Sequence, residues 1–228
     1  MMSALHLEHR NDVYILHFDH GARNNTLDDA VVDEFNAALD QIEGTTGNAA
    51  LLITSDDAKF WCNGIDLDYI KTRGMSYLVT HFVHRLDQLL LRLALLDLPT
   101  VASIGGHAYG GGALLASACD FRTMRSDRGY FCFPEVDIRL PFTDIMTRIV
   151  ELLPDERARR ELALTGRPMG GAEAAARGVV DAAFGAEDLF EHAFAMAATL
   201  AGKDRATYAA IKHALRRSLH PLLDPARR

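Results

Sequence analysis

Short apolar runs alternate with longer segments of helical periodicity through the first 126 residues. This alternation restricts the fold more than any other feature of the chain. Two segments, 27–43 and 77–97, carry apolar residues at helical spacing. Four runs have the length and apolar content of buried strands: 13–19, 49–55, 100–104 and 121–126. Strands that alternate with helices are typical of an α/β fold with right-handed crossovers.

The C-terminal part of the chain follows a different pattern. From Phe142 onward nearly every segment reads as helix, interrupted at 164–171 and 184–188. We therefore divide the chain into an α/β core, residues 1–165, and a helical region, residues 166–228.

Composition and charge exclude several classes of function. The 228 residues carry a formal net charge of −7, which argues against nucleic acid or an anionic membrane as the main partner. The most apolar stretch is interrupted by Arg92, Asp97 and Pro99, so we expect no membrane-spanning segment. The three cysteines have no CxxC spacing, and the N-terminus lacks the apolar run of a signal peptide. These features predict a cytoplasmic protein with reduced thiols.

Two glycine turns follow two of the predicted strands. The segment KFWCNGIDLDYI (59–70) follows strand 49–55, and HAYGGGALL (107–115) follows strand 100–104 and leads into a predicted helix at about 111–118. Glycines that enter a helix leave backbone N–H groups free at its positive end. Either turn alone is more typical of a tight connection than of a site. Neither has the spacing of a dinucleotide fingerprint or a phosphate loop.

In combination, the motifs resemble one family. The order KFWCNGIDL, PTVASIGGHAYGGGALLASACD and FPEVDI is similar to that of the crotonase superfamily, also called the enoyl-CoA hydratase/isomerase family. The resemblance implies a fold of repeated ββα units with a helical C-terminal region that takes part in oligomerisation, as a homotrimer or a dimer of trimers. It also implies an acyl-CoA substrate that carries its own coenzyme A, so that no separate cofactor is expected.

The same resemblance assigns roles to single residues. The backbone N–H groups of Ile65 and Gly111 would form an oxyanion hole for the thioester oxygen, where fixed N–H dipoles stabilise developing charge. The segment at Asp66 and Leu67 would contact adenine, and Arg23 would face the CoA phosphates. A solvated arginine is an equally good interpretation of Arg23. The remaining expected lining residues of the substrate pocket are Asn63, Gly64, Gly110, Leu114 and Pro134.

One missing carboxylate separates the two main activities of the family. Hydratases of the family have two glutamates, and the position of the first is occupied here by Leu114, whereas the second is Glu135. Adding water requires that water be activated and a proton delivered, which two carboxylates share. Moving a double bond needs one base. Leu114 and the segment EVDIRLPF therefore favour a Δ3,Δ2-enoyl-CoA isomerase.

Other interpretations stay open at this level. Asp137 and Asp144 are alternative bases, and Asp144 could instead cap a helix. Weak hydration, thioester hydrolysis and non-catalytic acyl-CoA binding are alternative functions. His81 and His84 have metal-ligand spacing but no third ligand, so no metal is expected.

Overall fold

Two β-sheets of different size carry the fold, in a computed structural model that describes residues 3–223. The larger sheet has the strand order β1 (Leu5–Arg10), β2 (Val13–Phe18), β3 (Ala50–Ser55), β5 (Thr100–Ile104), β7 (Phe121–Arg125) and β10 (Ala182–Phe184). The smaller sheet has the order β4 (Phe60–Cys62), β6 (His107–Tyr109), β8 (Tyr130–Cys132) and β9 (Met169–Gly170).

Helices connect and cover these strands. The α-helices are α1 (Asp29–Glu43), α2 (Leu67–Arg73), α3 (Met75–Tyr77), α4 (Val83–Ala94), α5 (Gly111–Ala118), α6 (Glu135–Ile138), α7 (Asp144–Val150), α8 (Glu156–Thr165), α9 (Gly171–Ala176), α10 (Leu189–Ala201) and α11 (Arg205–Leu215). Two 3₁₀ turns, η1 (Gly21–Arg23) and η3 (Arg217–Leu222), and one π-helical turn, η2 (Leu78–Phe82), complete the described elements.

The chain repeats a ββα unit three times. In each unit the first strand (β3, β5 or β7) enters the larger sheet, and the second strand (β4, β6 or β8) enters the smaller one. A helix then follows: α2, α5 or α6. Neighbouring strands from successive units pair in parallel within both sheets. This arrangement confirms the α/β fold of repeated ββα units.

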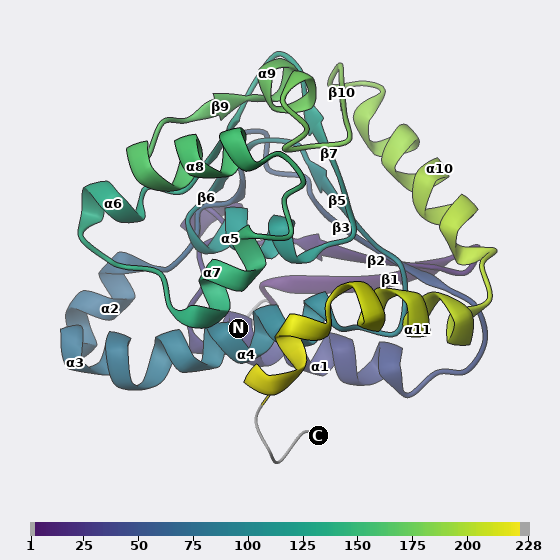
Figure 1. Cartoon of the computed structure of the whole chain (residues 1–228), viewed down its shortest axis with the longest axis horizontal. Helices are drawn as coiled ribbons and strands as arrows, with labels where there is room; N and C mark the ends of the chain where they lie inside the picture. The colour runs from purple at the N-terminus through teal and green to yellow at the C-terminus, as the bar shows by residue number, and fades with distance from the viewer. Residues whose placement is uncertain (1–2, 224–228) are drawn as a thin grey trace.

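The larger sheet is covered on both faces, as Figure 1 shows for α10 along one side and α5 on the other. Val13 and Ile15 pack with Ala193 and Ala197 of α10. The alternate residues, such as Leu16, belong to the main core cluster. Because side chains of a strand alternate between faces, the apolar run of β2 serves two cores at once.

Most of the expected elements are confirmed. The strands predicted at 13–19, 49–55, 100–104 and 121–126 correspond to β2, β3, β5 and β7. The helix predicted at 27–43 is α1, which Asp28 caps by accepting a hydrogen bond from the N–H of Val31 at 3.0 Å. The helix predicted at 77–97 runs from Met75 to Ala94 through a π-helical turn.

The short strands are the main difference from expectation. The strands of the smaller sheet have only two or three residues each, too few for a periodic pattern. The region after residue 166 is mostly helical, as expected, but it also supplies β10 at an edge of the larger sheet. Residues 1–2 and 224–228, the ends of the two predicted regions, lie outside the described residues.

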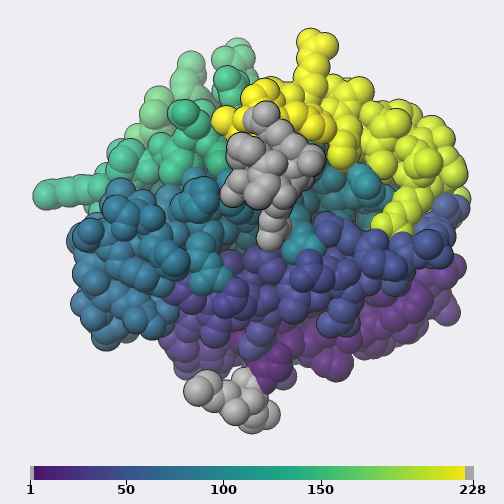
Figure 2. Space-filling view, turned by 90° about the horizontal axis from the view of Figure 1, so that it is seen from below, coloured from purple at the N-terminus to yellow at the C-terminus, as the bar shows by residue number. Residues whose placement is uncertain are grey.

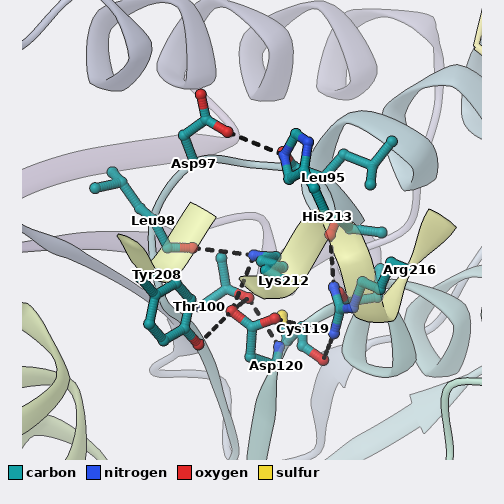
Figure 3. A network of polar contacts seen from close by, with 12 residues as sticks. Leu95, Asp97, Leu98, Thr100, Cys119, Asp120, Tyr208, Lys212, His213 and Arg216 are labelled. Carbon is teal, nitrogen blue, oxygen red and sulfur yellow. Dashed lines mark hydrogen bonds and ion pairs between the residues drawn. The ribbon is translucent and has the colours of Figure 1, made fainter. Parts of the chain in front are cut away.

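A buried ionic network attaches α11 to the core (Figure 3). The carboxylate of Asp120 accepts hydrogen bonds from Lys212 Nζ at 2.9 Å and from the Tyr208 hydroxyl at 3.0 Å. Arg216 forms an ion pair with the other oxygen of Asp120 at 2.9 Å. The N–H of Thr100 also donates to Asp120, which therefore joins the starts of β5 and β7 to the C-terminal helix.

This network places the C-terminal segment against the first half of the chain. Figure 2 shows the yellow C-terminal residues lying beside the blue and teal residues of the earlier segments. Arg216 donates to the carbonyl oxygen of Ala94 at the end of α4, and His213 contacts the carbonyl oxygen of Leu95. The helix α11 is thus part of the folded unit.

Replacing Asp120 by Ala should destabilise the protein by about 3–5 kcal/mol, because it leaves the buried ammonium of Lys212 without its counter-charge. Urea denaturation measures the change in the free energy of unfolding. Asp68 is the matched control: its side chain is 91% exposed and paired with Lys71, so Asp68→Ala should cost less than about 1 kcal/mol. Equal losses in the two variants would contradict the role given to Asp120.

Candidate active site

The smaller sheet brings the predicted site residues together. Its strands β4, β6 and β8 are parallel, with Cys62 paired to Ala108 and Tyr109 paired to Cys132. Each strand is followed at the same edge by one part of the predicted site. The three parts are Asn63-Gly64-Ile65, Gly110-Gly111 and Pro134-Glu135. We expected the turns to follow the long strands of the larger sheet, whereas they follow the short strands of the smaller one.

The two glycine turns are in direct contact. Gly64 has a φ angle of +75°, and a Cβ atom at that position would lie 2.6 Å from the carbonyl oxygen of Tyr109 and 2.9 Å from the nitrogen of Gly111. Gly110 also has a positive φ angle, +51°. Residues with side chains are strained in this conformation and would separate the turns. Glycine is therefore required for the backbones to approach.

Two backbone N–H groups are left free at this contact. In the first turn, the carbonyl oxygen of Gly64 accepts a hydrogen bond from the N–H of Leu27, and the N–H of Asp66 donates to the carbonyl oxygen of Leu27. The N–H of Ile65, between them, takes no part in this pairing. Gly111 is the first residue of α5, where an N–H has no partner within the helix. Within residues 3–223, neither the N–H of Ile65 nor that of Gly111 has a hydrogen-bond acceptor. Both are available to an incoming oxygen atom.

A cleft of about 640 Å³ opens beside these turns, a volume typical of small-molecule sites. Most of the predicted site residues line it: Arg23, Asn63, Gly64, Ile65, Asp66, Leu67, Gly110, Gly111, Pro134 and Glu135. Leu114 lies one helical turn further along α5, is 1% exposed and packs in the core instead of lining the cleft.

Glu135 is a buried carboxyl group in apolar surroundings. It is 7% exposed, and its Oε2 atom has no hydrogen-bond partner among the described residues. Its Oε1 atom would lie 3.3 Å from a Cβ atom on Gly110, so the carboxyl group sits directly beside the second turn. Desolvation of the charged form raises the pKa of Glu135 to about 7.

The other two carboxylates of the cleft have partners. Asp66 caps α2, accepting from the N–H of Tyr69 at 2.8 Å, and also forms an ion pair with Arg23. Asp68 is exposed and bonded to Lys71 at 2.7 Å. Among the described residues that line the cleft, only Glu135 is a buried acid without such a partner.

The basic residues of the cleft lie beside these two acids. Arg23 contacts both Asp28 and Asp66, and 44% of its side chain stays exposed. Lys71, which the sequence did not single out, also lines the cleft and is 74% exposed. Both basic side chains are paired with acids, but each stays exposed enough for a ligand to reach it.

The alternative candidates lie elsewhere. Asp137 and Asp144 are exposed and do not line the cleft. Asp144 does not cap α7, because Thr143 does so through its hydroxyl group. Cys62, which directly precedes the first turn, is fully buried, and desolvation raises the pKa of its thiol to about 12, which disfavours the reactive thiolate. The described residues contain no metal-ligand cluster around His81 or elsewhere.

Sequence reasoning missed several residues. Tyr69, Tyr109, Ile138 and Leu140 line the cleft. Leu140 belongs to the segment EVDIRLPF, and the position of this segment directly after Pro134 was the available signal. Asp87 on α4 is buried beside the hydroxyl of Thr143, and desolvation raises its pKa to about 6. Its place among the leucines of an apolar helix was the only indication.

Comparisons with known proteins show the family of the chain. The model of the enoyl-CoA hydratase/isomerase family matches residues 8–227. The chain belongs to this family. The "Enoyl-CoA delta isomerase 3" of Arabidopsis thaliana is 33% identical to it over 224 residues, which cover 95% of this chain and 92% of the relative.

Two further relatives of the family are similar. "Enoyl-CoA delta isomerase 2, peroxisomal", also from Arabidopsis thaliana, is 35% identical over 78% of this chain and 75% of its own length. A solved enoyl-CoA hydratase from Geobacillus kaustophilus superposes with a TM-score of 0.83 at 24% identity, covering 95% of this chain and 81% of that one, which supports the shared fold.

In the described part of the chain, no helix is long and apolar enough to cross a membrane.

Replacing Glu135 by Gln should change stability in a pH-dependent way. Because the pKa of the folded carboxyl group is raised from its ordinary value of 4.5 to about 7, folding loses stability as pH rises through this range. Gln cannot ionise, so the variant should gain roughly 2–3 kcal/mol relative to wild type between pH 5 and pH 8. Urea denaturation of both proteins at pH 5 and at pH 8 measures this difference in the free energy of unfolding. The exposed Glu187→Gln should show no such gain, and a pH-independent Glu135→Gln effect would contradict the burial of charge.

Proposed function

We propose that this family member is an isomerase that converts 3-enoyl-CoA to 2-trans-enoyl-CoA. The carboxylate of Glu135 removes a proton from C2 of the substrate. The electrons of that C–H bond form a dienolate, with negative charge on the thioester oxygen. Glu135, now protonated, returns the proton to C4, which leaves the double bond between C2 and C3. The reaction moves one proton and needs no cofactor besides the CoA that the substrate carries.

The isolation of Glu135 is the observation that carries this proposal. It is a buried, unpartnered carboxyl group beside the second glycine turn. Leu114, at the position of the first glutamate of the hydratases, has no polar group and lies in the core. A lone base is sufficient for a proton shuttle but not for activating water and protonating carbon together. The names of the two Arabidopsis relatives support the same reaction.

The free N–H groups of Ile65 and Gly111 support the second half of the mechanism. We propose that they hold the thioester oxygen, because donors fixed where charge develops stabilise the dienolate more than the substrate. At the other end of the cleft, Arg23 and Lys71 would contact CoA phosphates, and the α2 start at Asp66 and Leu67 would contact adenine. Arg23 would then exchange part of its contact with Asp28 and Asp66 for phosphate.

Replacing Glu135 by Gln should lower kcat for 3-hexenoyl-CoA by roughly 10²–10⁴, because general-base catalysis contributes about that factor. Binding of a saturated acyl-CoA, followed by thermal shift, should persist because the other contacts are unchanged. Asp137→Asn is the matched control on the same helix, and its exposed side chain should have little effect on rate.

Parallel assays with 2-hexenoyl-CoA separate the related activities. The wild type should isomerise the 3-enoyl thioester faster than it hydrates the 2-enoyl thioester. Faster hydration would identify the protein as a hydratase instead of an isomerase. Release of free CoA would identify it as a thioester hydrolase. Binding without any turnover would identify a non-catalytic acyl-CoA-binding protein.

The pH dependence of turnover should follow the ionisation of the base. The pKa of Glu135 is raised to about 7 by burial, and only the carboxylate can accept the C2 proton. We therefore expect kcat/KM to rise with pH and to reach half of its plateau near pH 7. A profile that is flat from pH 5 to pH 9 would exclude Glu135 as the base.

Assembly and location complete the proposal. We propose a homotrimer or a dimer of trimers, supported by large apolar side chains that stay exposed in the single chain: Leu164, Ile211 and Leu215. Leu215 is 81% exposed, which a neighbouring copy would cover. A cytoplasmic location is supported by three buried free thiols.

A further inference from the structure

A second pocket lies next to the cleft, behind Glu135. It has a volume of about 350 Å³ and is lined by Val136, Arg139, Pro141, Phe142 and Ala163 together with two residues of the cleft itself, Glu135 and Leu140. Because both cavities include Glu135 and Leu140, these two residues are the boundary between them.

The segment that forms this pocket is firmly held. Arg139 ends α6 with a φ angle of +59°, a conformation that turns the chain sharply. The N–H of Leu140 then donates to the carbonyl oxygen of Glu135 at 3.0 Å, which fixes the boundary residues relative to each other. The ring of Phe142 packs edge-on against Phe133, with centroids 5.7 Å apart.

The far end of the segment is anchored as well. The hydroxyl of Thr143 donates to the buried carboxyl group of Asp87 at 3.0 Å. It also accepts from the N–H of Met146 and so caps the N-terminus of α7. Asp87 has no part in the proposed proton shuttle, and this contact gives it a role in holding the loop. The pocket is thus formed before any ligand binds.

The chemistry of the walls selects an apolar ligand. Five of the lining residues are apolar: Val136, Leu140, Pro141, Phe142 and Ala163. Arg139 is exposed and Glu135 belongs to the boundary. A volume of 350 Å³ equals that of about twelve water molecules in the liquid, enough for several methylene groups.

We propose that this pocket receives the distal end of the acyl chain, and that Leu140 sets the chain length by controlling the passage into it. The proposal rests on the proposed isomerase function. If C1 lies at Ile65 and Gly111 and the CoA extends toward Arg23, carbons beyond C4 continue past Glu135 on the opposite side. Glu135 and Leu140 line both cavities, so a chain that passes these two side chains enters the second pocket.

The test compares 3-hexenoyl-CoA with 3-dodecenoyl-CoA. Val136 lines the second pocket but not the cleft, so Val136→Trp should fill the pocket without narrowing the cleft. The ratio of kcat/KM for the long substrate to that for the short one should fall at least about tenfold, because each methylene group removed from water favours binding roughly fourfold. Leu140→Phe should lower the same ratio by obstructing the passage. Val79→Trp adds the same indole to an exposed turn and should leave the ratio unchanged.

Binding measurements separate the two proposals. Calorimetry with hexanoyl-CoA and dodecanoyl-CoA needs no turnover, so it tests the pocket even if no 3-enoyl-CoA is isomerised. Loss of preference for the long chain in Val136→Trp would uphold the pocket whatever the reaction is. An unchanged preference in both folded variants, checked by thermal melting, would overturn it, whereas inactivity toward both 3-enoyl thioesters would overturn only the isomerase.

Discussion

The parallel pairing of β4, β6 and β8 is the constraint on which the site depends. These strands have three residues each, yet their register determines where the three following segments lie. Strands this short gain little from their own hydrogen bonds. They are held because a short connection joins each of them to the preceding strand of the larger sheet. The larger sheet is stable because its strands pair over more residues and both of its faces are buried. The larger sheet therefore fixes the relative positions of the three segments that form the site.

The environment of Glu135 combines a cost in stability with a benefit in reactivity. The apolar surroundings that leave Oε2 without a partner disfavour the charged carboxylate. The same desolvation brings its pKa to about 7, so that about half of the carboxyl groups are ionised at neutral pH and the carboxylate is a stronger base than an exposed one. A hydrogen-bond partner for Oε2 would stabilise the fold and weaken the base. Such opposition between stability and activity is common in active sites.

Much of this arrangement was accessible from the sequence. The long strands and α1 show clear periodicity, and the two glycine turns with Glu135 form a recognisable order of motifs. The strands of the smaller sheet were missed because a run of three residues has no measurable period. Leu140 and Lys71 belong to neither glycine turn, and they line the cleft only because of how the chain folds after those turns. The burial of Glu135 and the core position of Leu114 depend on packing between distant segments, which spacing along the chain does not contain.

The attachment of α11 has a consequence for the order in which the molecule is made. Asp120 and Lys212 are 92 residues apart, and the carboxylate that joins β5 and β7 has its ammonium partner near the end of the chain. At a synthesis rate of about 5–20 residues per second, that partner is added roughly 5–18 seconds later. The third ββα unit is completed at Ile138, early in this interval, and the carboxylate of Asp120 must stay solvated until Lys212 is added. The nascent chain can thus pair the strands of the three units first, and the ion pair that attaches α11 to them forms only after Lys212 has been made.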